Sequence, residues 1–364
     1  MSISGNAAQV KLQKFYILSL IQAFFFTLIC LLLTYIYKYV KFYLYLLFQR
    51  GFCAEAAASA QSLIIMKKAL IYGILGSLFF AFTFIFNRSM NLEGGYWLWS
   101  ACLRYIFTLP IMWLLVKRER GLRPVMAEIR KKPLDWIIWS TVGFGFFYMP
   151  LTMASIYGES WFVAATWQLT IVMGILLTPV FGKPVPLKNL AFAGVILAGI
   201  FLLQLSHLNN MNIHGMSAAL LLIIIGAVSY PLGNRKMMDY CPDNMTTIQR
   251  VFGMTLCSMP FWLLLSLYAL AQSGPPSYGQ TVQSFIVALF SGVIATVLFF
   301  EATNLVKANQ KQLALIEATQ SGEVLFTLLG GILFLSDSMP TAAGFIGIAV
   351  IVLGMIGNSF ASAK

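Results

Sequence analysis

Long apolar runs alternate with short polar gaps along most of this chain. From Met66 onward the pattern predicts ten apolar spans, each long enough to cross about 30 Å of hydrocarbon as an α-helix. Their approximate ranges are 69–88, 96–116, 134–155, 160–181, 188–206, 215–234, 249–271, 281–306, 312–335 and 341–360. The runs lack the apolar–polar alternation of membrane β-strands. The sequence therefore predicts an all-α polytopic membrane protein.

Basic residues mark one side of these spans. After Met66, seventeen Lys and Arg residues fall in every second gap, and only Arg88 falls in the remaining gaps. Loops rich in Lys and Arg stay in the cytoplasm. We therefore expect a multi-pass protein of the plasma (bacterial inner) membrane with a cytoplasmic C-terminus. Loop 117–132 is the most basic, and its amphipathic sequence favours contact with anionic lipid headgroups.

The composition supports a membrane location. The 364 residues are 59% hydrophobic and only 10% charged, which is too little charge to cover a soluble domain of this length. The net charge of +12 comes from basic residues beside apolar runs, so it indicates a lipid bilayer as partner and no nucleic acid. The sequence contains no CxxC pair, phosphate-binding glycine loop or nucleophile elbow, so we expect no metal, no cofactor and no enzymatic activity.

Residues 1–65 are predicted to be an extension outside the transport core. They contain one hydrophobic segment, 15–37, with basic residues on both flanks, so the charges give no clear orientation. The segment is also long for the apolar region of a signal peptide. We expect an appendage here, either an extra helix or an upstream extension of the reading frame.

The ten predicted spans divide into two repeats of five, residues 66–206 and 207–364. Because five is an odd number of crossings, the repeats would be inverted relative to one another. In transporters built this way, a small-molecule substrate binds near the bilayer midplane, between the repeats. Gly344, Gly347, Gly354 and Gly357 share one face of the last span, where small residues allow close helix contact. Packing within the bundle is the favoured interpretation, and a homodimer is the alternative.

Three stretches resemble a known transporter superfamily. SGEVLFTLLGGILFLSDSMPTAAGFIGIAVIVLGM (321–355) resembles the end of an EamA-like repeat of the drug/metabolite transporter superfamily, with an acidic residue at the outer end of its first helix. FNRSMNLEGGYWLWSACLRYIFTLP (86–110) and GFGFFYMPLTMASIYGESWFVAATWQLTIVMGILLTPVFGK (143–183) resemble its multidrug resistance efflux transporter branch. The resemblance covers 66–364 and implies secondary transport, with efflux of drug-like or metabolite molecules by proton antiport.

One departure from the superfamily concerns proton coupling. The resemblance to small multidrug exporters implies a membrane-embedded glutamate in the first helix, where protons exchange for cationic drugs. The first span here, KALIYGILGSLFFAFTFIF (68–86), has no acidic residue, and neither has the sixth. Proton coupling would therefore need a different group.

Arg104 and Glu323 are the main candidates for a substrate or coupling site. Ionisable residues inside a membrane are costly and often functional. Arg104 lies about 12 Å into the second span, and Glu323 reaches a similar level in the ninth. An arginine stays charged, so it needs an anionic partner, an anionic substrate or water. Glu323 is the expected partner, either in a static ion pair or in a gating or substrate role.

Other embedded polar residues are secondary candidates. Glu301 and Glu317 lie near the cytoplasmic ends of their spans, where snorkelling to the interface is favoured. Gln320, Glu323 and Thr327 fall on one helix side and predict a polar stripe.

Mid-depth residues of three further spans complete the candidate set. Gln168 lies in the fourth span, where an interhelical hydrogen bond is the main alternative to a ligand contact. Trp167, Tyr148 and Tyr230 are deep enough to hold an organic cation against their rings, although core packing is the commoner role of buried aromatics.

Three functions follow from these residues. The first is efflux of small organic molecules, with proton exchange through Glu323. The second is export of an amino acid or another metabolite, in which Arg104 faces the substrate carboxylate. The third is a non-transporting membrane sensor or assembly protein, in which Arg104 and Glu323 form a static pair.

Overall fold

A computed structural model describes residues 54–119, 121–207, 213–242 and 244–362. The apolar segment 15–37 lies outside these ranges. The chain divides into two compact units between Ile64 and Ile65, and the fold given below is that of Ile65–Lys364. Throughout the described residues, the regular secondary structure is helical. In this part of the chain, the all-α prediction is confirmed.

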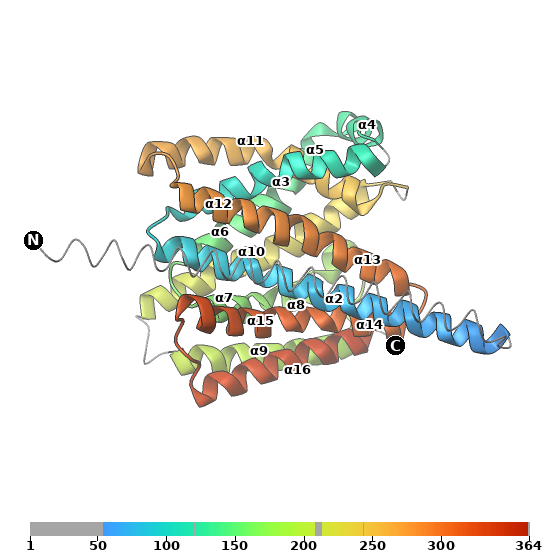
Figure 1. The fold of residues 1–364 in the computed structure, drawn as a ribbon. Helices are drawn as coiled ribbons and strands as arrows, with labels where there is room; N and C mark the ends of the chain where they lie inside the picture. Colours follow the sequence, from blue (N-terminus) through green and yellow to red (C-terminus); the bar gives the residue numbers. More distant parts are fainter. Residues whose placement is uncertain (1–53, 120, 208–212, 243, 363–364) are drawn as a thin grey trace, which may run out of the picture. The chain divides into compact units, whose positions relative to one another are not determined.

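The elements before residue 210 form the first part of the bundle (Figure 1). They are α2 (Ala54–Leu92), α3 (Trp97–Glu119), α4 (Arg123–Lys131), α5 (Pro133–Ser140), the π-helical segment η1 (Thr141–Gly145), α6 (Phe146–Ala154), α7 (Ser160–Trp167), α8 (Leu169–Leu176), the 3-10 helix η2 (Thr178–Phe181) and α9 (Leu187–His207).

The later elements begin with two long helices (Figure 1). They are α10 (Ile213–Tyr240), α11 (Thr247–Ser273), α12 (Tyr278–Val287), the π-helical segment η3 (Ala288–Ala295), α13 (Thr296–Val306), α14 (Gln310–Ala318), the 3-10 helix η4 (Thr319–Ser321), α15 (Gly322–Gly330), the π-helical segment η5 (Gly331–Leu335) and α16 (Ala342–Ser362).

Nine helical stretches in the described residues are long and apolar enough to cross a membrane, which makes the chain a multi-pass membrane protein. The fourth predicted span differs from the expectation of ten continuous helices. It forms a shorter apolar helix, Ser160–Leu176, that is interrupted at Gln168. Gln168 adopts φ −63° and ψ −8°, and its side-chain amide donates to the Ala164 carbonyl at 3.1 Å. The inverted five-helix repeats stay a prediction.

The glycine face of α16 packs against α9, and the two helices lie side by side (Figure 1). A Cβ atom added to Gly199 of α9 would lie 2.8 Å from the Ile351 nitrogen and 2.9 Å from the Gly347 carbonyl oxygen. A Cβ on Gly354 would lie 3.1 Å from the Ile196 nitrogen. The glycines therefore serve packing within the chain, and a homodimer would need another surface.

Gly199→Ala is expected to destabilise the protein by about 1–3 kcal/mol, because the added methyl group overpacks a backbone contact. Gly194 on the same helix is a matched control, since a Cβ there meets no atom within 4 Å. Gly194→Ala should leave stability unchanged or raise it, because alanine favours helices by up to about 1 kcal/mol. The midpoint of thermal unfolding of the purified protein in detergent measures both effects. Equal midpoints for the two variants would contradict the proposed close packing.

The helices around the interior carry the main candidate residues. Helix α3 contacts α6, α11, α12 and η3, while α10 contacts α6, α7 and α8. Helix α2 reaches η3 through stacked Phe79 and Phe290 rings, whose centroids lie 5.3 Å apart. It also reaches α15, where Ile85 fills the space beside Gly330. Arg104 on α3, Tyr148 on α6, Tyr230 on α10 and Glu323 on α15 thus come from helices that pack around the same part of the bundle.

Candidate functional site

Arg104 is buried between three elements, with 9% of its surface exposed. Its Nη1 donates to Thr83 Oγ1 of α2 at 3.3 Å, and its Nη2 donates to Ser291 Oγ of η3 at 3.4 Å. The guanidinium carbon lies 4.0 Å from the ring centroid of Tyr148, a cation–π contact. Ser291 lies in the π-helical segment η3. Such a segment rotates the side chains that follow it about the helix axis, and π-helical segments are frequent at functional sites.

The expected ion pair between Arg104 and Glu323 is wrong for this structure. Among the described residues, salt bridges within 4.0 Å join only Arg88 to Asp337 and Lys131 to Glu128. Hydroxyl groups and a ring face surround the Arg104 charge where a carboxylate was expected. Two of the five N–H donors of the guanidinium form these hydrogen bonds to hydroxyl groups.

Glu323 lies in the first turn of α15, directly after the 3-10 turn that interrupts the ninth span. A negative charge is favourable at this end of a helix. The side chain is half-buried, and no described residue forms a hydrogen bond or salt bridge with its carboxylate. The Thr327 hydroxyl, expected in the same polar stripe, donates to the backbone carbonyl of Glu323 at 2.7 Å. The carboxylate nevertheless lies within electrostatic range of Arg104 and Tyr230.

The three predicted aromatic residues are neighbours joined by Phe147. The Phe147 ring centroid lies 5.0 Å from that of Trp167 and 4.8 Å from that of Tyr230, and Phe147 also contacts Tyr148. Tyr148 is fully buried and exchanges hydrogen bonds with Asn87, while Trp167 is 7% exposed. Tyr230 is 39% exposed. Tyr230 thus offers the most accessible ring surface of the three, and the other two pack in the core.

The remaining candidates lie apart from Arg104. Gln168 bonds within its own helix, so the interhelical hydrogen bond expected for it is not found. Glu317 and Gln320 line a separate cavity beside α16. Glu301 is exposed on α13, and in the described part of the chain neither Glu301 nor Glu317 forms an ion pair with a lysine.

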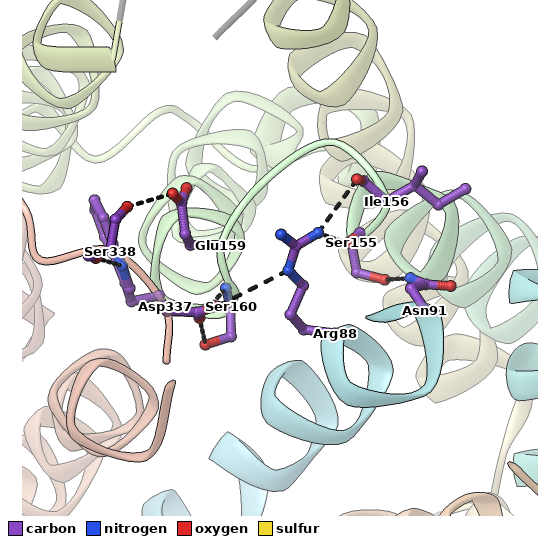
Figure 2. Close-up of polar contacts among 9 residues, drawn as sticks. Arg88, Asn91, Ser155, Ile156, Glu159, Ser160, Asp337 and Ser338 are labelled. Carbon is purple, nitrogen blue, oxygen red and sulfur yellow. Dashed lines mark hydrogen bonds and ion pairs between the residues drawn. The ribbon is translucent and has the colours of Figure 1, made fainter. Parts of the chain in front are cut away.

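A polar cluster that the sequence did not single out lies at the C-terminal end of α2 (Figure 2). Helix α4, from the basic loop, lies at the other end of the bundle (Figure 1). Arg88 Nη1 donates to the backbone carbonyls of Ser155 and Ile156, each at 3.3 Å. Arg88 Nε lies 3.9 Å from Asp337 Oδ1. Asp337 Oδ2 accepts hydrogen bonds from the backbone nitrogen of Ser160 at 2.9 Å and from its hydroxyl at 2.6 Å. We call Arg88, Ser160 and Asp337 the far-end cluster.

Further bonds around the far-end cluster connect the same segments (Figure 2). Ser338 Oγ donates to the Glu159 carboxylate, and Asn91 Nδ2 donates to Ser155 Oγ at 2.6 Å. Trp161 Nε1 donates to the Ser338 carbonyl at 3.0 Å. The end of α2, the α6–α7 connection and the η5–α16 connection are therefore held together. Two sequence signals point to this cluster: the isolated basic residue Arg88 and the acidic residue that ends the ninth span.

Comparisons with known proteins find similarity over most of this chain. A family model described as "Putative multidrug resistance efflux transporter" matches residues 67–364. A Bacillus subtilis (strain 168) relative, "Uncharacterized protein YjlA", is 49% identical over 308 residues, which cover 81% of this chain and 95% of the relative. A Shouchella clausii relative, "Uncharacterized 42.1 kDa protein in intracellular alkaline protease 3'region", is 41% identical over 282 residues, 74% of each chain. A solved structure described as "Crystal structure of protein" has the same fold, with a TM-score of 0.54, 15% identity, and coverage of 80% of this chain and 96% of that one.

Proposed function

Because this chain belongs to the multidrug resistance efflux transporter family, a family of small-molecule efflux transporters, we propose that it exports small organic molecules in exchange for protons bound at Glu323. This proposal rests on how the two ionisable residues inside the predicted membrane spans, Arg104 and Glu323, are arranged. Arg104 and Glu323 lie within electrostatic range of each other without forming an ion pair. We further propose the plasma membrane as the location, with the C-terminus in the cytoplasm.

Unpaired charges inside a membrane are costly to keep, which supports a functional role for both. A carboxylate without a hydrogen-bonding side chain can take up a proton or a cationic group without first breaking an existing bond. The Tyr230 hydroxyl lies within electrostatic range of the same carboxylate, and the exposed part of this side chain can hold the organic part of the cargo. Proton and cargo would then compete for one region of the bundle, which is the basis of antiport.

Export of an amino acid or a similar metabolite is the second candidate. The observation that favours it is the absence of any carboxylate within 4.0 Å of Arg104 in the described part of the chain. A zwitterion would place its carboxylate at Arg104 and its ammonium group at Glu323. The non-transporting sensor or assembly protein loses its main support, because it rested on a static Arg104–Glu323 pair.

Reconstituted transport tests the proposal. The full chain in proteoliposomes, with an imposed pH gradient and an internal pH-sensitive dye, should dissipate the gradient when a suitable cargo is added. The panel contains cationic drugs, amino acids and sugars, and protein-free liposomes provide the control. Labelled cargo that moves without any proton flux would reject proton exchange and retain transport. Failure of every compound to move in either assay would contradict the proposed function as a whole.

A further inference from the structure

A cavity lies beside α16, and neither Arg104 nor Glu323 is among its lining residues. Its volume is about 190 Å³, and it is bordered by α8, α13, α14, η4 and α16. Its lining residues are Ile171, Phe299, Glu317, Gln320, Met355, Asn358 and Ser359. We propose that this cavity binds a small primary ammonium ion, with the charged nitrogen at Glu317.

Glu317 gives the cavity its charge. It is the only ionisable residue among those that line the cavity, and its side chain is half-buried. In the described part of the chain no basic group lies within 4.0 Å of its carboxylate, although Lys311 precedes it by less than two helical turns. A partly desolvated carboxylate without a counter-ion attracts a cation. The charge therefore selects a positively charged ligand over a neutral or anionic one.

The hydrogen-bonding groups of the cavity favour a ligand with several N–H donors. The Ser359 hydroxyl donates to the Met355 carbonyl at 3.1 Å, so its oxygen can only accept from a ligand. The Gln320 side chain has no bond to a described residue, which leaves its carbonyl oxygen as a second acceptor. The Glu317 carboxylate is the third. A primary ammonium group carries three N–H donors and matches three acceptors, whereas a quaternary ammonium ion has none.

The apolar side chains and the size of the cavity limit the rest of the ligand. Ile171, Phe299 and Met355 can cover a short hydrocarbon chain. A volume of about 190 Å³ suits an amine of a few carbon atoms and is too small for a drug-sized compound, since pockets for such compounds span about 300–1,000 Å³.

This site is separate from the one in the proposed function, so binding there can be measured without transport. Gln320 precedes Glu323 by three residues, so the backbone that borders the cavity continues within one helical turn to Glu323.

Calorimetric titration of the purified full chain with n-butylammonium chloride tests the proposal. We expect saturable binding that Glu317→Gln weakens by about tenfold or more, because a charged hydrogen bond is lost. Glu301→Gln is the matched control, since it removes an exposed carboxylate from α13 and should leave the affinity unchanged. Ser359→Ala should weaken binding by a smaller factor, and it tests the site if Glu317→Gln fails to fold. Neutral n-butanol and trimethylbutylammonium should bind more weakly than n-butylammonium.

Several outcomes would overturn the assignment. Folded wild-type protein that binds no n-butylammonium in the millimolar range lacks the site. Equal affinity in Glu317→Gln and Glu301→Gln would exclude Glu317 as the cation-binding group. Equal affinity for n-butylammonium and trimethylbutylammonium would exclude recognition of the ammonium group by the three acceptors. If Glu323→Gln loses binding while Glu317→Gln retains it, the cation binds at Glu323. The protein could then still transport cargo, so failure of this site and failure of the proposed function remain distinguishable.

Discussion

Glu323→Gln is expected to abolish cargo-dependent proton movement while the protein stays folded. The amide has the shape of the carboxyl group but does not titrate between pH 4 and pH 10, so it cannot exchange a proton for cargo. The expected cost in stability is small, because no described residue bonds to the Glu323 carboxylate. Dye-reported proton flux in proteoliposomes should fall to the level of protein-free vesicles, and downhill movement of labelled cargo should remain detectable.

Two controls make this result specific to Glu323. Glu301→Gln removes an exposed carboxylate and should leave proton flux unchanged. Glu323→Asp keeps a titratable group on a side chain one methylene shorter, so partial flux is expected. Unchanged proton flux in Glu323→Gln would remove Glu323 from the coupling mechanism, and loss of folded protein on size-exclusion chromatography would assign it a structural role.

The membrane spans could be predicted from sequence because apolar length is a local property. The turn at Gln168 could not, since it lies inside one long hydrophobic run and differs from a continuous helix only in its backbone hydrogen bonds. The π-helical segment around Ser291 could not be predicted from the sequence for the same reason. Hydropathy gives the extent of a span, whereas the hydrogen-bond pattern inside it depends on neighbouring helices.

The candidate site was predictable in its residues and less so in its contacts. Counting residues from the span ends places Arg104 and Glu323 at one depth, but depth leaves the rotation of each helix about its axis undetermined. Arg104 therefore contacts Thr83, Ser291 and Tyr148 where an ion pair with Glu323 was expected.

The far-end cluster illustrates a different limit. Asp337 accepts both of its hydrogen bonds from a residue 177 positions earlier, and each partner lies in or beside a connecting segment. Sequence patterns report on periodic elements, and they carry little information on which loops meet. The single basic residue at that end, Arg88, was visible in the charge pattern, but its partners required the tertiary structure.

Substitutions of Arg104 are expected to separate carboxylate cargo from cationic cargo. Arg104→Gln should weaken binding and transport of a carboxylate-bearing compound by about 10-fold to 100-fold, because a charged hydrogen bond contributes about 1.5–3 kcal/mol. Arg104→Lys keeps the charge but loses the planar fork that can hold two carboxylate oxygens, so an intermediate loss is expected. Binding of a cationic compound should not weaken, since removing the positive charge relieves its repulsion. Parallel titrations with an amino acid and an organic cation measure the difference.

Packing effects have to be separated from charge, because Arg104 also links α2 to α3 and η3. Thr83→Val is the matched control, since it removes a hydroxyl contact of Arg104 and retains the guanidinium and a side chain of similar size. If Arg104 recognises carboxylates, Thr83→Val should affect both cargo classes alike and by a smaller factor than Arg104→Gln affects the amino acid. Equal losses for the amino acid and the cation in Arg104→Gln would instead mean that Arg104 holds the helices in place, and cargo export would then rest on Glu323 and the Tyr230 ring alone.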